Sequence, residues 1–224
     1  MYFKFTTPLK LADIPQIPFE PAQYRDHFRL AVIDNEPFIF GNELRKHHYN
    51  LTELGDISDV SAVAEYPIVA CDIRDIGKHF GTEYEGAHVI AEMRKLYPDK
   101  FLIAFSGGSF GPSYKKYWDS CDVFLRRDGG FDQWIATLDD GIRKMGDPVV
   151  RWKRVRQALL EAGISTFEVF LLEEAYIKSV IKGDTYHLAH AIKRVKRLTS
   201  AGEALNKVAE GLIASVKLFI QLKA

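Results

Sequence analysis

Apolar residues in the first two thirds of the chain gather in short runs, separated by polar and glycine-containing stretches. The runs at Phe28–Ile33, Pro67–Cys71 and Phe101–Phe105 are almost uninterrupted, which is typical of strands buried on both faces of a parallel sheet. Weaker runs at Asn50–Leu54 and Val123–Leu125 predict two further strands. The pattern therefore predicts five strands in this part of the chain.

Segments with helical spacing lie between and after these strands. They are Phe38–His48, Asp59–Glu65, Gly86–Leu96, Pro112–Trp118 (a helix or a turn) and Phe131–Lys144. Alternation of strands and helices predicts an α/β fold with a doubly wound, five-stranded parallel sheet. Right-handed crossovers bring the carboxyl ends of such strands to one edge of the sheet.

The C-terminal third of the chain has helical spacing and no strand-like run. Val149–Ala162 predicts one helix, and Ser165 or Thr166 caps a second helix that runs to Lys182. A glycine breaks this helix, and helical spacing then resumes as far as Leu222. We expect a helical hairpin or a small bundle in this region.

The N-terminal segment is interrupted by prolines, which forbid a long regular element. They are Pro8, Pro15, Pro18 and Pro21. Tyr2–Phe5 predicts a short edge strand, followed by an extended arm that packs on the body and covers the sheet edge. The predicted organisation is an arm at 1–26, an α/β domain at 27–146 and a helical output or dimerisation region at 147–224.

Composition excludes several classes of protein. Hydrophobic residues make up 47% and charged residues 27% of 224 residues, as in ordinary globular proteins. No apolar run approaches the roughly 20 residues that span a bilayer, and Met1–Lys10 has no signal-peptide pattern. Cys71 and Cys121 have no metal-ligand spacing and suit a reducing compartment. We therefore expect a cytoplasmic protein.

Charge is distributed unevenly although the net charge is zero. Residues 147–224 contain 13 Lys and Arg against 8 Asp and Glu, a net charge of +5, which leaves −5 for residues 1–146. The basic part is expected either to attract the acidic part, to contact an acidic partner or to form an ordinary solvated helix surface.

Chemically active side chains follow the predicted strands. Asp34 follows the first strand, Asp72 the third and Ser106 the fourth, and Arg127 lies just after the fifth. Ligands of open parallel sheets bind outside the carboxyl ends of the strands. The sequence therefore predicts a site with two acids, a hydroxyl and a cation at one edge.

This order of residues resembles the receiver domain of two-component response regulators, the CheY-like fold. The resemblance covers about 120 residues and implies the strand order 2-1-3-4-5. It also implies that Asp72, followed by I-R-D-I-G, accepts a phosphoryl group from a phosphohistidine. The implied Mg²⁺ ligands are the side chains of Asp34, Asn35 and Asp72 and the backbone carbonyl of Arg74.

The resemblance assigns roles to three further residues. Ser106 and Arg127 are expected to contact the phosphoryl oxygens, and Phe124 takes the position of the switch aromatic. Two departures from the family weaken the site. Asn35 stands where the family has a second aspartate, which lowers metal affinity, and Arg127 replaces a lysine, whose compact ammonium it cannot reproduce.

The segment 78–85 is longer than the corresponding family turn, and is expected to cover the site or to contact a partner. His79 in this segment is expected to be solvent-exposed rather than a ligand. The stretch S-G-G-S-F-G-P-S at 106–113 resembles the loop of PP-loop ATP pyrophosphatases, but Phe110 stands in place of its aspartate. We interpret it as a glycine-rich loop beside Ser106.

A second resemblance lies in the helical region. A-H-A-I-K at 189–193 resembles the A-H-x-L-K of histidine phosphotransfer domains, which makes His190 a speculative phosphotransfer residue. The residues after Lys193 are bulky and charged, so the favoured interpretation is a helix with Ile192, Val195 and Leu198 inward and a basic outer face. Nucleic acid is not an expected partner because no recognition helix is evident.

Two functional hypotheses follow. The first is a response regulator that accepts a phosphoryl group on Asp72 from a sensor histidine kinase or a phosphotransfer protein. It signals through the C-terminal helices, to an output protein or by forming a homodimer. An apolar face there is expected either to dimerise or to pack on the receiver domain of the same chain; it comprises Phe167, Phe170, Leu171, Ile177 and Val180. The second is a phosphorylation-independent pseudo-receiver that acts as an adaptor. An enzyme is disfavoured because no acid/base pair besides the two aspartates is evident.

Overall fold

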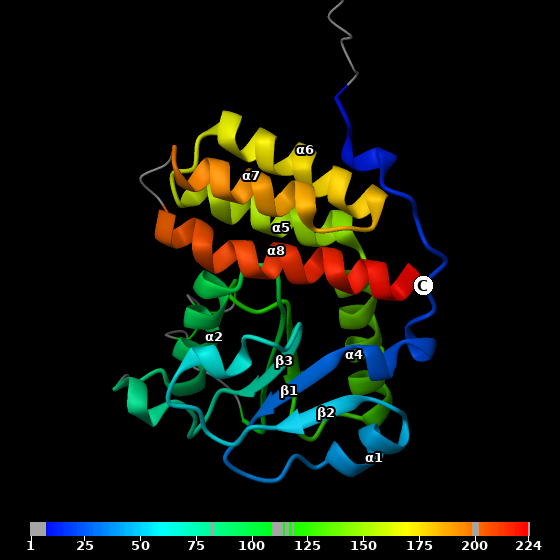
Figure 1. Cartoon of the computed structure of the whole chain (residues 1–224). Helices are drawn as coiled ribbons and strands as arrows, with labels where there is room; N and C mark the ends of the chain where they lie inside the picture. The colour runs from blue at the N-terminus through cyan, green and yellow to red at the C-terminus, as the bar shows by residue number, and fades with distance from the viewer. Residues whose placement is uncertain are drawn as a thin grey trace, which may run out of the picture. The chain divides into compact units, whose positions relative to one another are not determined.

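The chain divides into two compact units, which are described separately. One is Phe19–Met145, and the other combines Met1–Pro18 with Gly146–Ala224. A computed structural model describes residues 8–81, 83–108, 114, 117, 119–198 and 202–223 (Figure 1). The predicted strand at Tyr2–Phe5 and most of the predicted Pro112–Trp118 element lie outside the described residues. None of the described helices is both long and apolar enough to cross a bilayer.

A five-stranded parallel sheet forms the centre of the first unit, in the order β2-β1-β3-β4-β5 (Figure 1). The strands are β1 (Arg29–Ile33), β2 (Asn50–Glu53), β3 (Ile68–Asp72), β4 (Phe101–Ser106) and β5 (Val123–Arg126). Every residue of β3 and β4 is buried, as the uninterrupted apolar runs predict. The predicted α/β fold class and strand order are confirmed; the order is that of flavodoxin-like folds.

Among the described residues of this unit, the predicted helices at 86–96 and 131–144 are confirmed, the one at 38–48 is shorter, and the one at 59–65 is a 3₁₀ turn. The helices are α1 (Gly41–Lys46), α2 (Glu85–Leu96) and α4 (Phe131–Gly146), with 3₁₀ turns η2 (Pro21–Gln23), η3 (Arg25–His27), η4 (Val60–Val63) and η5 (Lys78–Phe80). The helix predicted at 38–48 ends early because His48, the last residue of that range, adopts a left-handed conformation with φ of 66°. The predicted helix at 59–65 is only the turn η4, which Asp59 caps.

Aromatic residues fill the sheet face that α4 covers. The rings of Phe38, Phe105 and Trp134 lie with centroids 4.9–5.7 Å apart. Gly141 lets α4 approach the sheet, because a Cβ at this position would lie 2.7 Å from the ring of Phe101. The opposite face carries aliphatic side chains from the strands and from α2, such as Val69 and Ile90. Both faces of the sheet are therefore packed, which fixes the positions of the strand ends.

A half-buried polar cluster joins α4 to η3 and to the residue that precedes β2. Asp139 accepts hydrogen bonds from Arg25 Nη2 at 2.6 Å, Arg25 Nε at 2.9 Å and the Tyr49 hydroxyl at 2.6 Å. The Arg25 guanidinium also lies over the Tyr49 ring, 4.6 Å from its centroid. One carboxylate thus holds η3 and the residue before β2 against α4.

Replacing Asp139 by alanine is expected to lower the free energy of unfolding of this unit by about 2–3 kcal/mol, because the half-buried Arg25 guanidinium and the Tyr49 hydroxyl lose their charged acceptor. Urea unfolding of the full chain, resolved by hydrogen exchange in α4, measures this loss. Asp140→Ala is the control, since Asp140 is 38% exposed in its pair with Lys144, and it should cost less than about 1 kcal/mol. Equal losses in both variants would contradict a specific role for Asp139.

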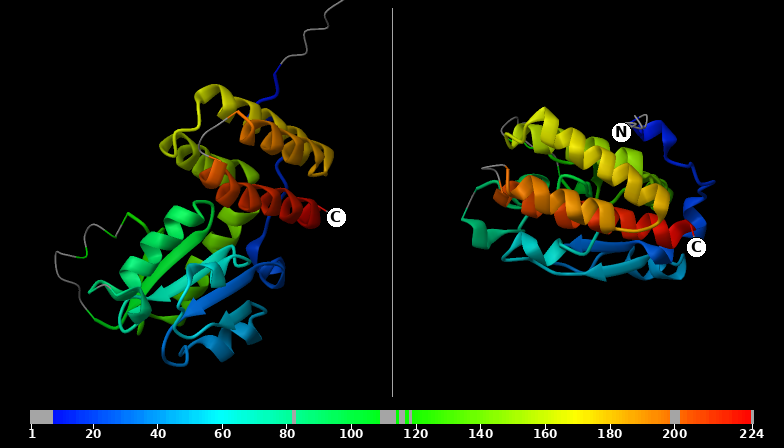
Figure 2. Two further views of the ribbon diagram at one scale, coloured as in Figure 1. Left: turned by 60° about the vertical axis from the view of Figure 1, so that its left-hand side comes forward. Right: turned by 45° about the horizontal axis from the view of Figure 1, so that its top comes forward.

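The second unit contains four helices among its described residues. They are α5 (Pro148–Glu161), α6 (Thr166–Lys182), α7 (Tyr186–Lys196) and α8 (Gly202–Lys223), which lie side by side in Figure 2. Asp147 caps α5, accepting from the amide of Val149 at 2.7 Å. Ser165 and Glu168 form a capping box at the start of α6. Local sequence signals therefore set the ends of these helices.

The helical unit has its own apolar core. Trp152 stacks on Tyr176 at 5.2 Å, and the Tyr176 hydroxyl donates to the Pro148 carbonyl at 2.9 Å. The N-terminal arm contributes Ile14 to this core, with Leu9, Leu11 and Ile17 packed against it. This part of the arm, including the 3₁₀ turn η1 (Leu11–Asp13), therefore belongs to the helical unit.

Candidate functional site

Two buried aspartates lie side by side at the carboxyl edge of the sheet. Asp72 ends β3 and Asp34 follows β1, and the parallel pairing sets Ile33 opposite Cys71. The exposed fractions of Asp34 and Asp72 are only 5% and 3%. The neighbouring strands β1 and β3 form the switch point of this topology, the edge position at which such sheets bind ligands.

Arg127 joins both aspartates from the end of β5. Its Nη1 donates to Asp72 Oδ2 at 2.7 Å, and its Nη2 lies 2.9 Å from Asp34 Oδ2. The same Nη2 lies 3.0 Å from Glu36 Oε2. The Arg127 backbone amide donates to the Ser106 carbonyl at 2.9 Å, which holds the residue beside β4. A single guanidinium therefore contacts three carboxylates.

Backbone amides orient the same two carboxylates. Asp34 Oδ1 accepts from the amide of Glu36 at 2.9 Å, and Asp72 Oδ1 accepts from the amide of Arg74 at 3.0 Å. Asp34 Oδ2 is buried and has no aligned hydrogen-bond donor among the described residues. Its attraction to Arg127 at 2.9 Å is therefore an ion pair without good hydrogen-bond geometry.

Burial raises the pKa of both aspartates above the usual range of a carboxyl group. The pKa of Asp72 is raised further by the charge of Asp34, while the Arg74 amide and Arg127 lower it in part. For Asp34, the Glu36 amide and Arg127 oppose the effect of burial on the pKa. Because Arg127 carries only one charge against the carboxylates that it contacts, the site retains an excess of negative charge.

The side chains do not fit Mg²⁺ as they are arranged. The Arg127 guanidinium binds the carboxylate oxygens of Asp34 and Asp72 that would face a shared cation. Asn35, the third predicted side-chain ligand, is exposed. Within the described part of the chain, no group of three or more His, Cys, Asp or Glu side chains is placed to hold a metal ion. Arg127 supplies the positive charge at this position.

Ser106 and Phe124 complete the predicted set on β4 and β5. Ser106 is 1% exposed, and its hydroxyl accepts from the amide of Gly108 at 3.3 Å. Phe124 is half-buried and packs against the apolar cluster on the α2 side of the sheet. Both residues occupy the strand positions that the sequence predicts.

The side chain of Arg74 is a feature that the sequence analysis missed. We assigned only its backbone carbonyl a role, yet its guanidinium lies over the Gly108 backbone: a Cβ at Gly108 would meet it at 2.4 Å. The contact of Glu36 with Arg127 was also not predicted. Both involve side chains that reach across from one loop to another, which residue spacing does not reveal.

The loop after β3 is fixed at both ends. The amide of Gly77 donates to Asp56 Oδ1 at 2.7 Å, and the amide of Asp75 donates to Glu85 Oε2 at 2.8 Å. Gly86 lies against the end of β3, since a Cβ there would be 2.1 Å from the Asp72 carbonyl oxygen. His79 is exposed in η5. The loop therefore borders Asp72 directly.

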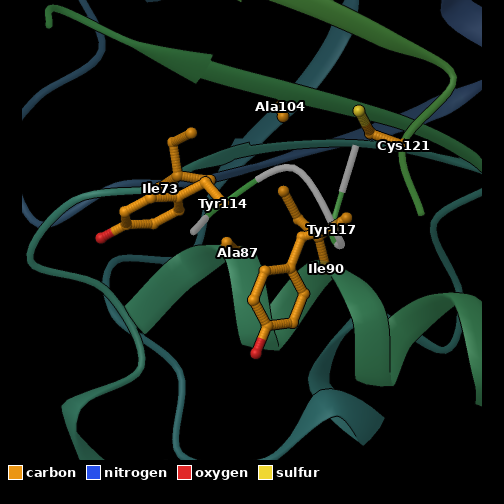
Figure 3. Close-up of a pocket in the computed structure, with 7 residues that line it drawn as sticks. All are labelled: Ile73, Ala87, Ile90, Ala104, Tyr114, Tyr117 and Cys121. Carbon is orange, nitrogen blue, oxygen red and sulfur yellow. The ribbon is translucent and has the colours of Figure 1, made fainter. Parts of the chain in front are cut away.

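A small apolar pocket lies beside the residue that follows β3 (Figure 3). Its lining residues are Ile73, Ala87, Ile90, Ala104, Tyr114, Tyr117 and Cys121. Ile73 follows Asp72 in sequence, so the pocket and the aspartate share one strand end. Figure 3 shows the two tyrosine rings beside α2. These described lining residues offer packing surface for an apolar group.

His190 lies on α7, in the helical unit, and is exposed. Its ring lies 6.4 Å from that of Tyr186. Ile192 and Val195 are buried, whereas Lys193 and Arg194 are exposed. Leu198, which we expected to face inward, is 60% exposed, because α7 ends at Lys196 and the inward-facing turn of the helix stops there.

The carboxyl edge of the sheet thus gathers two buried aspartates, a buried serine and an arginine that links the aspartates. No protein-family model matches this chain, and no curated protein sequence matches it at a significant level.

Proposed function

We propose that Phe19–Met145 is a receiver-type signalling module whose phosphoryl acceptor is Asp72. The observation that carries this proposal is the convergence of Asp34, Asp72 and Arg127 at the carboxyl ends of β1, β3 and β5. Phosphoryl transfer needs a carboxylate nucleophile and positive charge on the phosphoryl oxygens. This edge of the sheet supplies both from the protein's own side chains.

In the proposed step, a carboxylate oxygen of Asp72 forms a bond to phosphorus, and the bond between phosphorus and the donor's imidazole nitrogen breaks. The donor histidine, protonated at its other ring nitrogen, leaves as neutral imidazole. Arg127 moves its hydrogen bonds from Asp72 to the phosphoryl oxygens, and Ser106 donates to one of them. The donor is a sensor histidine kinase or a phosphotransfer protein, and Phe124 transmits the change along β5.

Intact-mass measurement after incubation with acetyl phosphate tests this proposal, with and without added Mg²⁺. The native chain is expected to gain one phosphoryl group, and Asp72→Asn is expected to gain none. Asp75→Asn is the matched control, because Asp75 is exposed and pairs only with Lys78 among the contacts described; it should be modified as the native chain is. Modification of Asp72→Asn would overturn the assignment of the acceptor.

A second candidate function is a phosphorylation-independent pseudo-receiver that acts as a protein-interaction adaptor. The observation in its favour is that Arg127 already binds both aspartates, so the site is closed by an internal cation. In that case, a folded native chain gains no phosphoryl group from acetyl phosphate. An Arg127→Lys variant, which restores a compact ammonium, then also stays unmodified.

A further inference from the structure

Helix α6 carries a stripe of apolar side chains on its solvent-exposed side. Phe167 is 62% exposed, Phe170 45% and Ile181 36%, and Leu171 between them is half-buried. Phe170, Leu171 and Ile181 follow Phe167 by three, four and fourteen residues, which places all four on one face of a helix with 3.6 residues per turn. Exposed apolar residues that cluster on one face often mark a surface that binds a partner.

The opposite face of α6 already has its partners. Val169, Leu172, Tyr176 and Val180 are buried in the core of the helical unit. Ile177 is also buried there, so Ile177 and Val180 do not share one face with the exposed Phe167 and Phe170, as we predicted. The core of the unit therefore does not need the exposed stripe, and the stripe is available for an intermolecular contact.

The centre of the stripe is charged in a self-complementary way. Glu174 and Lys178 lie between Leu171 and Ile181 and form an ion pair at 2.8 Å. Their side chains are 30% and 40% exposed. An antiparallel copy of α6, related by a two-fold axis that crosses the helix midway between the two residues, would place each Glu174 against the partner's Lys178.

We propose that the α6 stripe is a homodimer interface in which two copies of α6 pack antiparallel. In this register Leu171 meets Ile181 of the second copy, and Phe170 packs on the partner's Ile181 and on the aliphatic part of Lys178. In such a two-fold interface the same surface of each chain contacts the other, so assembly stops at the dimer. The proposal concerns α6 alone and holds whether or not Asp72 is phosphorylated.

Sedimentation-velocity analysis of the full chain over a series of concentrations tests the proposal without any phosphoryl donor. The native chain is expected to associate reversibly to a dimer. Phe170→Glu is expected to weaken the dimer at least about 100-fold, because each carboxylate would be buried against an apolar surface. Ile39→Glu is the matched control: Ile39 is an apolar residue, 56% exposed in the α/β unit and outside α6, and its change should leave the dimer intact. A monomeric native chain at all concentrations would overturn the proposal, as would an unchanged dimer in Phe170→Glu.

A charge exchange tests the antiparallel register independently of the apolar residues. Glu174→Lys alone and Lys178→Glu alone each place like charges across the axis, and each variant is expected to be weakened as a dimer. An equimolar mixture of the two variants is expected to form a heterodimer, because the lysines at positions 174 and 178 of one chain then meet the glutamates at positions 178 and 174 of the other. A mixture that stays as weakly associated as its components contradicts this register, since a loss of helix stability alone would not be repaired by mixing.

Discussion

Replacing Arg127 by methionine is expected to lower the free energy of unfolding of the α/β unit by about 3–5 kcal/mol near neutral pH. The side chains of Asp34 and Asp72 are 3% and 4% exposed, and they would remain buried without a cation. Methionine preserves most of the aliphatic contacts of arginine, so the loss reports on charge. Hydrogen exchange in β1 and β3 during urea unfolding measures it in this unit alone.

The loss is expected to depend on pH in a defined direction. The folded-state pKa values of Asp34 and Asp72 are raised above the ordinary value of 3.8. The contribution of the two aspartates to the free energy of unfolding is therefore fully present below pH 3.8, and it is lost as the pH rises through their folded-state pKa values. Without Arg127, which lowers both pKa values, this loss grows. The deficit of Arg127→Met relative to the native chain should thus be small in acid and largest above neutrality.

Arg126→Met is the control for this experiment. Arg126 precedes Arg127, but its side chain is 72% exposed and pairs with Asp128, which is 65% exposed. Such a pair contributes little to stability because water screens it. We expect Arg126→Met to unfold like the native chain. A pH-independent loss in Arg127→Met, or the same loss in Arg126→Met, would show that the ion pairs with Asp34 and Asp72 are not its cause.

Replacing Arg94 by methionine is expected to cost the same unit about 3 kcal/mol, since a half-buried carboxylate loses its guanidinium partner and three carbonyl groups lose the hydrogen bonds that Arg94 donates. Arg94 lies near the end of α2, and its Nη2 donates to Asp122 Oδ2 at 2.7 Å. Its other bonds, of 2.9–3.0 Å, go to the carbonyls of Pro98, Lys100 and Ser120. One side chain thus joins α2 to the segments that enter β4 and β5.

Lys95→Met separates this effect from a general loss of positive charge on α2. Lys95 is 69% exposed and pairs with Glu92 within the helix, so its replacement should change the free energy of unfolding by less than about 1 kcal/mol. Urea denaturation of both variants, followed by hydrogen exchange in β4, makes the comparison. If the amides of β4 are protected from hydrogen exchange as fully in Arg94→Met as in Lys95→Met, the hydrogen bonds of Arg94 do not stabilise the sheet.

Sequence reasoning located the site because the strand ends have simple signals. An apolar run followed by Asp34, Asp72 or Ser106 marks a strand and the residue that leaves it, and parallel topology brings these ends together. The contacts within the site are harder to predict. The guanidinium of Arg127 reaches Asp34, Asp72 and Glu36 at the end of a long side chain with many rotamers, and residue spacing does not specify which of them is adopted.

Other differences arise where local signals compete. Asp59 indicates a helix start, but the segment that follows forms only one 3₁₀ turn before β3 begins. The prolines of the arm exclude a long helix, and its described part forms only the short turns η1, η2 and η3, yet prolines contain no information about which surface receives the arm. Ile14 is 5% exposed within the helical unit. Its apolar character predicts burial, whereas the surface that buries it is set by tertiary packing.

The close approach of Gly86 to β3 has a mechanical consequence. The first turn of α2 lies against the Asp72 carbonyl oxygen. A Cβ at Gly86 would be 2.1 Å from this oxygen, so there is no room for a methyl group between the helix and the strand end. We therefore expect a displacement of Asp72 toward α2 to move this helix, and with it Ile90, which lines the apolar pocket. A change in the environment of the amides in the first turn of α2 would then indicate a displacement of Asp72.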